Sequence, residues 1–445
     1  MLFNIMWLMS FSINKIRSSN VSAYQFFQLS RLAVAIFISI LLVKIGFEKI
    51  EVSTFELFIF TANLFSFFWV MGIKNASLSF YPSLNIADKK SFYFNSFVIL
   101  QLLGFVFAIF MYIWLVNGNS ENETLSNGIV PWLISAFLLF YAPTVLIEIL
   151  FILEKKSKEL FNYAVGIHLL QLVAVSITAW ITKDIISLFI VLFAWTFCKW
   201  IFTFWLVLKT KQFDLRIGLV KKLIVFSSPI IMHILLGNGM EFIDGLLVNQ
   251  FFSPDLFAVF RYGARELPFF VILIAALSST MIPIAVKDIN NASSEIRSRT
   301  LKLMHLFFPA SILLIFFSPW LFSTFYSAEY LDSALLFNTY LLILASRIIM
   351  VEVFVYAKHL NKVLMYVSLG ELLINIILSI LFMQFWGLTG IAIATVIAFM
   401  LSKISLVAFI WINHKIRLTE YVHLPAYFTY TSLLYAGYFI SLFFL

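Results

Sequence analysis

The chain has 445 residues, of which 62% are hydrophobic and only 12% are charged, and its formal net charge is +8. This composition lies outside the range of soluble globular domains and is typical of helical membrane proteins. It excludes a water-soluble enzyme. The positive charge needs no nucleic-acid partner, because basic loops facing an anionic membrane surface account for most of it.

Apolar stretches long enough to cross a membrane follow one another along the whole chain. A helix needs roughly 20 apolar residues to cross a hydrocarbon core about 30 Å thick. The thirteen predicted spans are 22–47, 52–73, 92–116, 129–153, 161–181, 185–208, 223–250, 256–286, 301–325, 332–357, 363–386, 388–412 and 424–445. We therefore expect an all-α, polytopic helical membrane protein.

The basic residues predict how the chain is oriented, because Lys and Arg of short loops stay on the cytoplasmic side. Most of the 30 Lys and Arg residues lie in alternate loops, such as Lys74, Lys89 and Lys90 after the second span. The longest loop of the other set, 117–128, holds two Glu residues and no cation. We expect a cytoplasmic amino terminus and an external carboxyl terminus.

A faint internal repeat divides the spans into two sets. Gly166 and Lys199 match Gly370 and Lys403, in both cases at an offset of 204 residues. An offset near 200 residues equals six spans, which preserves their direction, so the pattern predicts two parallel six-helix repeats plus an extra C-terminal helix. The expected domains are 1–210, 211–415 and, for the additional helix, 416–445.

Three segments of the second half carry a family resemblance. Residues 221–251 begin with KK, continue to Pro229 and place Asp244 ahead of a short turn, and FYSAEYLDSALLF (325–337) and GLTGIAIAT (387–395) follow in order. In this order they resemble segments of O-antigen and capsule repeat-unit flippases, which are polysaccharide transporters of the multidrug/oligosaccharidyl-lipid/polysaccharide superfamily. The resemblance covers about half of the chain.

This resemblance implies a fold like that of multidrug and toxin extruders, and a transport function. Its members move undecaprenyl-pyrophosphate-linked oligosaccharide from the inner to the outer leaflet of the bacterial cytoplasmic membrane by alternating access. The implied partners are this substrate, membrane lipids, and glycan polymerase and chain-length proteins. Three alternatives stay open: a multidrug extruder, a lipid II flippase of the same superfamily, and a non-transporting scaffold for glycan assembly.

Catalytic motifs are missing from the sequence. It contains no Gly-x-Ser-x-Gly, His-Glu-x-x-His, P-loop or Asp-x-Asp pattern. The single Cys198 excludes an internal disulfide and a cysteine metal site. We expect a secondary transporter with no metal site and no cofactor, coupled to H+ or Na+.

Charged residues inside the spans need an explanation, because each costs roughly 2.5–3.5 kcal/mol at the centre of a membrane helix. An Arg fork binds two phosphate oxygens and a Lys acts as a point charge, so intramembrane cations suit a pyrophosphate. The predicted substrate-binding residues are Arg31, Lys199, Arg261, Arg265, Arg347 and Lys403. The alternative is structural pairing, for example of Arg347 with Glu352. The available acids are Glu148, Glu241, Asp244, Glu266, Glu352 and Glu371.

Three carboxylates are candidates for ion coupling: Glu241, Asp244 and Glu371. Glu241 and Asp244 lie at i, i+3 in the seventh span, and an antiparallel hairpin would bring them beside Arg265 and Arg261, respectively. Such pairs would be structural, or would represent one state of a transport cycle.

The seventh span also contains a predicted hinge. Pro229 removes an intrahelical hydrogen bond and favours a bend, and Gly237 and Gly239 follow it. A bent helix would help two bundles to rock. The alternative is a static role, since proline is also common in rigid membrane helices.

Overall fold

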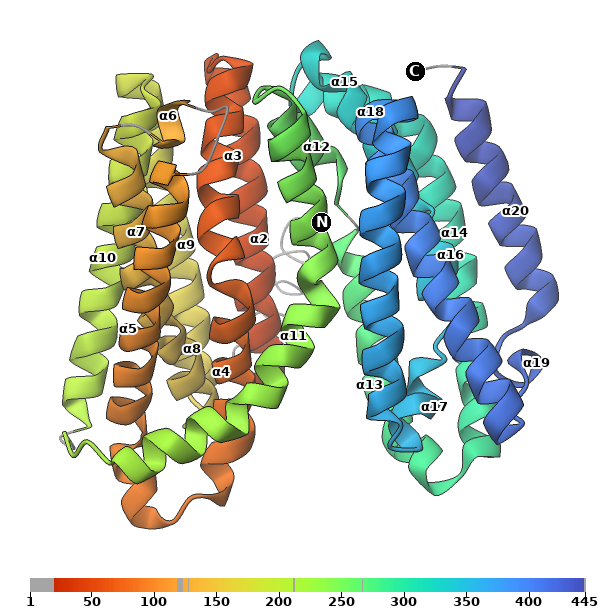
Figure 1. The fold of residues 1–445 in the computed structure, drawn as a ribbon, viewed down its shortest axis with the longest axis horizontal. Helices are drawn as coiled ribbons and strands as arrows, with labels where there is room; N and C mark the ends of the chain where they lie inside the picture. The colour runs from red at the N-terminus through yellow and green to blue at the C-terminus, as the bar shows by residue number, and fades with distance from the viewer. Residues whose placement is uncertain (1–19, 118–122, 127, 211–212, 266, 444–445) are drawn as a thin grey trace, which may run out of the picture. The chain divides into compact units, whose positions relative to one another are not determined.

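The computed structural model describes residues 20–117, 123–126, 128–210, 213–265 and 267–443. Within these ranges the chain forms α-helices and short 3-10 turns, without strands. It divides into two compact units, Met1–Leu235 and Leu236–Leu445 (Figure 1). The division lies inside helix α11, further along the chain than residue 210, where the sequence pattern places the boundary.

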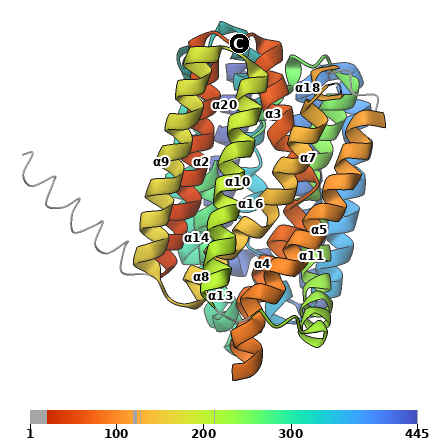
Figure 2. The same ribbon diagram turned by 90° about the vertical axis from the view of Figure 1, so that its left-hand side faces the viewer.

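Unit 1 contains the first six predicted spans. Helix α2 packs along α9, and α10 packs against α7 (Figure 2). The elements are α2 (Asn20–Ile45), α3 (Lys49–Leu64), α4 (Phe67–Phe80), η1 (Tyr81–Ser83), α5 (Ile86–Asn117), α6 (Glu123–Ser126), α7 (Val130–Tyr141), η2 (Ala142–Thr144), α8 (Val145–Leu153), α9 (Ser157–Thr182), α10 (Ile185–Lys209) and the first part of α11 (Ile217–Phe251).

Unit 2 contains the rest of α11 and the remaining predicted spans. Helix α14 is the centre of this unit, since it packs against α13, α15 and α20. The elements are α12 (Leu256–Gly263), α13 (Pro268–Lys287), α14 (Ile289–Phe325), η3 (Ala328–Tyr330), α15 (Leu331–Leu341), α16 (Leu344–Arg347), α17 (Glu352–Ala357), α18 (Asn361–His414), α19 (Leu418–Tyr421) and α20 (Leu424–Ser441).

The membrane character and the fold class are confirmed. Over the described ranges, eight helices are long and apolar enough to cross a membrane, or nine if the bent pair Lys49–Leu64 and Phe67–Ser83 is one span. Two features explain most of the difference from thirteen predicted spans. The eighth and tenth are each broken into shorter helices, and the eleventh and twelfth run together through a kink at Gly387 in α18.

Broken spans leave backbone carbonyls without their usual helical partners, and in a membrane these groups must be satisfied internally. Side chains from later helices supply the donors in the tenth span. Lys403 Nζ of α18 donates to Ile349 O at 3.2 Å, and the Tyr427 hydroxyl of α20 donates to Ala345 O at 3.1 Å. The interruption between α16 and α17 is therefore a stabilised part of the unit.

The backbone repeats itself at the offset that the sequence predicts. Lys155 and His359 adopt left-handed conformations with φ of 55° and 57°, and they lie 204 residues apart. Lys183 and Gly387, also 204 residues apart, both have a positive φ, of 47° and 57°, but their ψ angles of 37° and −136° differ. These residues precede and follow matching helices, so both units change chain direction at matching positions, with a different backbone conformation at the second corner.

The extra C-terminal helix is an integral part of unit 2. Asn338 of α15 donates to Ser441 Oγ at 3.4 Å, and the hydroxyls of Thr339 and Tyr438 are 3.0 Å apart. All four side chains are buried. Helix α20 lies outside the repeat, but buried polar contacts attach it to the repeated core.

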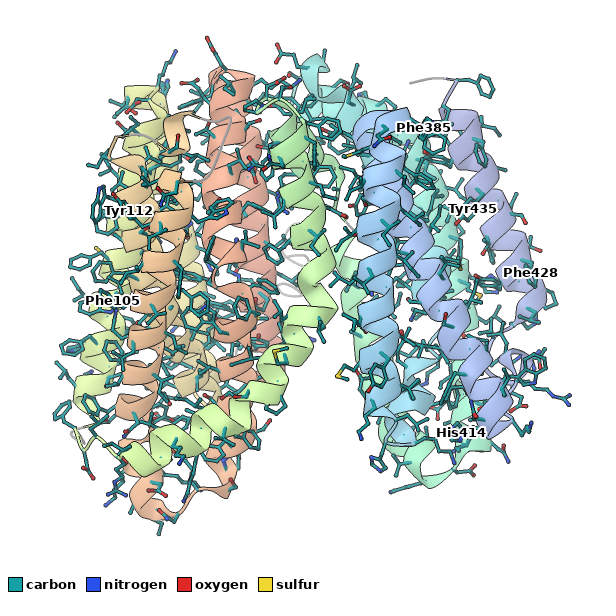
Figure 3. All side chains as sticks on the ribbon, in the orientation of Figure 1. Phe105, Tyr112, Phe385, His414, Phe428 and Tyr435 are labelled. Atoms are coloured by element: carbon teal, nitrogen blue, oxygen red, sulfur yellow. The ribbon has the colours of Figure 1, made fainter. Side chains whose placement is uncertain are left out.

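Aromatic side chains project from the outer surfaces of both units. Phe105, Phe385 and Phe428 are exposed, and Figure 3 shows them pointing away from their helices. Such exposure is costly in water and favourable in hydrocarbon, so these surfaces suit contact with lipid.

Candidate functional site

A buried ion pair between Lys74 of α4 and Glu148 of α8 forms the centre of a charged cluster in unit 1. The two side chains are 2% and 7% exposed, and Lys74 also donates to the Tyr24 hydroxyl at 2.8 Å. The prediction that Lys74 belongs to a loop is wrong. Helix α4 continues to Phe80, and Glu148 offsets the buried charge.

Arg31 of α2 lies beside the same carboxylate. Its Nη1 is 3.9 Å from Glu148 Oε1, and its Nη2 donates to Gln28 Oε1 at 2.5 Å. Gln28 in turn donates to Glu148 Oε2 at 3.2 Å. The Arg31 side chain is 48% exposed, so its guanidinium keeps donors that an incoming anion can reach.

Lys199 of α10 is the third cation of this cluster. It interacts electrostatically with Arg31 and Glu148, yet no described residue forms an ion pair or hydrogen bond with its ammonium. His168 of α9 lies near both cations and shares a hydrogen bond of 2.7 Å with the Ser30 hydroxyl. Three cations and one carboxylate give the cluster a formal charge of +2.

The corresponding cluster in unit 2 is electrically balanced. Lys403 pairs with Glu352, and Arg347 lies with its guanidinium carbon 4.3 Å from the centre of the Phe399 ring. Glu371 bonds to Ser402 and interacts electrostatically with Arg347 and Lys403. Glu352 thus receives its ion pair from α18. The charges of the two cations and the two carboxylates therefore sum to zero.

Arg261 and Arg265 lie where the eighth span is interrupted. Arg265 Nε donates to Arg261 O at 2.8 Å, and its guanidinium carbon is 5.7 Å from the centre of the Tyr262 ring. Glu266 and the side chain of Glu241 fall outside the described residues. The pairing of Arg265 with Glu241 therefore stays a prediction.

A group of oxygen atoms surrounds Asp244, which is 1% exposed in unit 2. Its Oδ2 accepts hydrogen bonds from Thr395 Oγ1 at 2.7 Å and from the Tyr340 hydroxyl at 3.1 Å. Asn375 Nδ2 donates to Thr395 Oγ1 at 2.9 Å. Asn375 Oδ1 and Ser379 Oγ, one turn apart on α18, are buried and have no hydrogen-bond partner among the described residues.

These neutral partners of Asp244 were not among the predicted site residues. Threonine, asparagine and tyrosine are common in membrane helices and give no charge signal that would select them. The only available signal was that GLTGIAIAT, which ends at Thr395, belongs to the family resemblance. The predicted pairing of Asp244 with Arg261 stays a prediction.

The predicted hinge residues lie on one helix, α11. The helix passes through Pro229 and continues to Phe251. A Cβ at Gly239 would lie 3.8 Å from Leu372 Cδ1, which is ordinary contact, and Gly237 falls outside the residues described in side-chain detail. The hinge stays a prediction.

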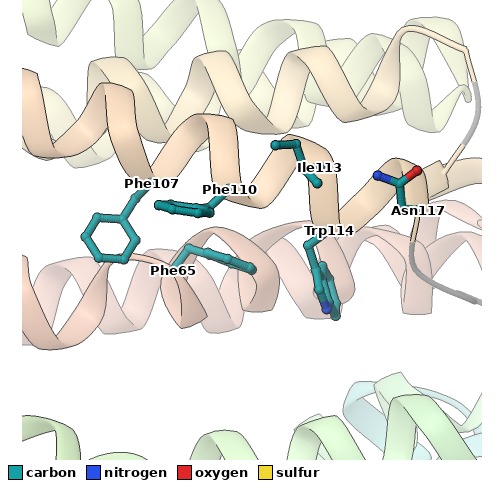
Figure 4. A pocket seen from close by; sticks show the side chains of 6 residues that line it. All are labelled: Phe65, Phe107, Phe110, Ile113, Trp114 and Asn117. Carbon is teal, nitrogen blue, oxygen red and sulfur yellow. The ribbon is translucent and has the colours of Figure 1, made fainter.

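An open groove on unit 1, with a volume of about 520 Å³, contains none of these charges. It is lined by apolar and aromatic side chains and one amide: Phe65, Phe107, Phe110, Ile113, Trp114 and Asn117 (Figure 4). Such a lining suits hydrocarbon and offers little to a phosphate. The candidate anion site is therefore the cluster of Arg31, Lys74, Glu148 and Lys199.

Comparisons with known proteins agree with a transport fold. Residues 54–335 match the model of a family described as polysaccharide biosynthesis protein. No curated protein sequence matches the chain. Among solved structures, the lipid II flippase MurJ in its inward closed conformation has a TM-score of 0.69 at 17% identity, with 95% of this chain and 98% of that chain covered.

Two further solved structures share the fold at lower similarity. A mutant of VcmN, a MATE transporter from Vibrio cholerae, has a TM-score of 0.59 at 14% identity, covering 92% of this chain and 98% of that one. A MOP superfamily transporter from Pyrococcus furiosus has a TM-score of 0.56 at 13% identity, covering 90% and 96%. At these identities the likeness concerns the fold alone.

Proposed function

Because the chain belongs to the polysaccharide biosynthesis protein family, we propose that it flips an undecaprenyl-pyrophosphate-linked oligosaccharide across the bacterial cytoplasmic membrane. Transport would run from the inner to the outer leaflet by alternating access, with the amino terminus in the cytoplasm and the carboxyl terminus in the periplasm. The family match and a fold like that of transporters support a carrier without catalytic residues.

The observation that carries this proposal is the net positive cluster of unit 1. A pyrophosphate and its sugars cannot cross hydrocarbon unaided, because each unpaired polar group there costs several kcal/mol. Arg31 offers a half-exposed guanidinium fork and Lys199 an ammonium without a described ion-pair partner. We assign these two side chains to the phosphate oxygens, and we assign Lys403 to bracing the broken tenth span.

The charge of the cluster also bears on the three alternatives, a multidrug extruder, a lipid II flippase and a scaffold. An extruder of cationic drugs needs net negative charge where its substrate binds, whereas this cluster is net positive. A lipid II flippase carries the same polyprenyl pyrophosphate on a different glycan, so the glycan has to be identified by experiment. A scaffold would not depend on Arg31.

Leaflet analysis in cells tests the proposal. In cells depleted of the protein, a membrane-impermeant glycan probe applied to spheroplasts should show loss of outer-leaflet lipid-linked oligosaccharide. Wild type should restore it, Arg31→Ala should not, and Arg31→Lys should restore it partly, since a lysine keeps the charge without the fork. Arg299→Ala, at an exposed pair with Glu295, is the matched control. Full restoration by Arg31→Ala would refute the assignment.

We further propose that Na+ binding at Asp244 drives the cycle. Hard cations prefer oxygen ligands, and one carboxylate with the oxygens of Thr395, Asn375 and Ser379 supplies such a set. The buried oxygens of Asn375 and Ser379 without hydrogen-bond partners support this choice over a proton, which would need only the carboxylate.

A flipping assay in proteoliposomes distinguishes Na+ coupling from H+ coupling. An imposed Na+ gradient should stimulate flipping in wild type, and Asp244→Asn and Thr395→Val should abolish that stimulation. If a proton gradient alone stimulates transport, and Thr395→Val keeps the response while Asp244→Asn loses it, the coupling ion is H+. If neither gradient has any effect, coupling at Asp244 is wrong.

A further inference from the structure

The internal repeat relates the charged residues of the two units pair by pair. Glu148 corresponds to Glu352 and Lys199 to Lys403, both at the offset of 204 residues that relates the positive-φ corners of the backbone. In unit 2 these positions form a direct ion pair. In unit 1 the equivalent pair is not formed among the described contacts, and Glu148 is bound by Lys74.

Lys74 is thus the residue that binds Glu148 in place of the repeat-related lysine. Its ammonium and the amide of Gln28 both bond to Glu148 Oε2. The remaining oxygen, Oε1, is 3.9 Å from Arg31, which is beyond a hydrogen bond. Lys199 interacts electrostatically with Glu148 but forms no ion pair with it among the described contacts.

We propose that Lys74 is a positioning residue, which occupies Glu148 and thereby leaves Arg31 and Lys199 available to a pyrophosphate. This inference rests on the proposed function, because it explains how the same site keeps its charge. Lys74 itself is 2% exposed and does not touch the ligand in this assignment.

The formal charges of the cluster in wild type and in three variants distinguish a positioning role of Lys74 from direct contact with the ligand. The wild-type cluster carries +2, Lys74→Met carries +1, Glu148→Gln carries +3, and the double variant Lys74→Met/Glu148→Gln returns to +2. A positioning role predicts that affinity follows this order of charge. A residue that contacts the ligand would leave the double variant as weak as Lys74→Met.

The experiment is calorimetric titration of the full chain in nanodiscs with two probes, inorganic pyrophosphate and geranylgeranyl pyrophosphate. We expect Lys74→Met to bind at least about tenfold more weakly than wild type, which corresponds to about 1.4 kcal/mol. The double variant should return to within about threefold of wild type, a difference well below that factor of ten. Tighter binding of the lipid probe identifies a lipid headgroup as the ligand, and equal binding identifies a free diphosphate.

A surface pair of the same residue types provides the control. Lys156 binds Glu154 at 2.5 Å with both side chains partly exposed, and Lys156→Met should leave affinity for both probes unchanged. Thermal midpoints of all variants check folding. Glu148→Gln should bind at least as tightly as wild type even if its midpoint falls, which a merely structural role of the pair does not predict.

The outcomes separate the inference from the function on which it rests. If wild type binds neither probe, the pyrophosphate site of the proposed function fails, and the positioning role fails with it. If wild type binds but Lys74→Met binds equally well, only the positioning role is overturned. If the double variant stays as weak as Lys74→Met while remaining folded, Lys74 contacts the ligand directly and is not a positioning residue.

Discussion

Replacing Lys403 by Met should destabilise unit 2 by an amount that its contacts allow to be worked out. The ammonium pairs with Glu352 and donates to Ile349 O, and the lysine side chain is 7% exposed. Removing one partner of a buried ion pair costs about 3–5 kcal/mol, because the other charge is left uncompensated. Glu352 is 28% exposed, which places the ion-pair part at the lower end of that range.

The lost carbonyl bond adds about 1 kcal/mol, so the expected total is about 3–4 kcal/mol. For a unit of about 200 residues, in which 1 kcal/mol shifts the thermal midpoint by about 2–4 °C, this corresponds to a fall of roughly 6–16 °C. The assay is the fraction of monodisperse protein in detergent after heating. Adding Glu352→Gln should recover about half of the loss, since no unpaired carboxylate then remains.

Lys199→Met is the matched comparison, because Lys199 occupies the equivalent position in unit 1 and has no ion-pair partner among the described residues. Its midpoint should stay at the wild-type value or rise, since an ammonium without an ion-pair partner is unfavourable inside a membrane-spanning helix. If Lys403→Met and Lys199→Met lower the thermal midpoint equally, the assignment of Lys403 to stabilising the fold and of Lys199 to binding the ligand is refuted.

Three smaller changes test local parts of the fold. The Ser187 hydroxyl, together with backbone amides, holds the pKa of Asp184 below its usual value at the start of α10. Asp184→Ala should therefore lower the free energy of unfolding by about 1 kcal/mol at neutral pH, which is measured as a lower thermal midpoint. The difference should vanish as the pH falls through that lowered pKa. Gly263→Ala would place a Cβ 2.5 Å from Ser333 O and should cost about 1–3 kcal/mol, whereas Gly370→Ala, with open space, should not destabilise; thermal midpoints compare them. Asn95→Ala removes two bonds of 2.9 Å to the backbone before α11 and should speed tryptic cleavage there in limited proteolysis.

The membrane spans and the repeat could be predicted from the sequence because apolar length and residue offsets are one-dimensional signals. Helices α9, α10 and α20 begin within four residues of the predicted spans, whereas α14 begins at Ile289, twelve residues before its predicted span. The breaks of the eighth and tenth spans gave no such signal. Residues 342–351 are apolar except for Ser346 and Arg347. The carbonyl of Ile349, at the interruption, accepts a hydrogen bond from Lys403, which is distant in sequence.

The candidate site was predictable only in part, for a related reason. An intramembrane charge such as Arg31 or Lys199 is visible in the sequence, but its partner is not. Lys74 looked like a loop residue because it follows an apolar run of sufficient length, and only the position of Glu148 explains its burial. Neutral oxygen ligands around Asp244 give no signal of their own.

The positive-φ corners at matching positions of the two units have a consequence for where side chains lie. Glu148 lies seven residues before the corner at Lys155, just as Glu352 does before His359, and both lysines lie sixteen residues after their second corner. A turn that fixes the direction of the next helix also fixes the position of each side chain on that helix. Equivalent positions can therefore carry different ion pairs, since Glu352 binds Lys403 whereas Glu148 binds Lys74 from a neighbouring helix.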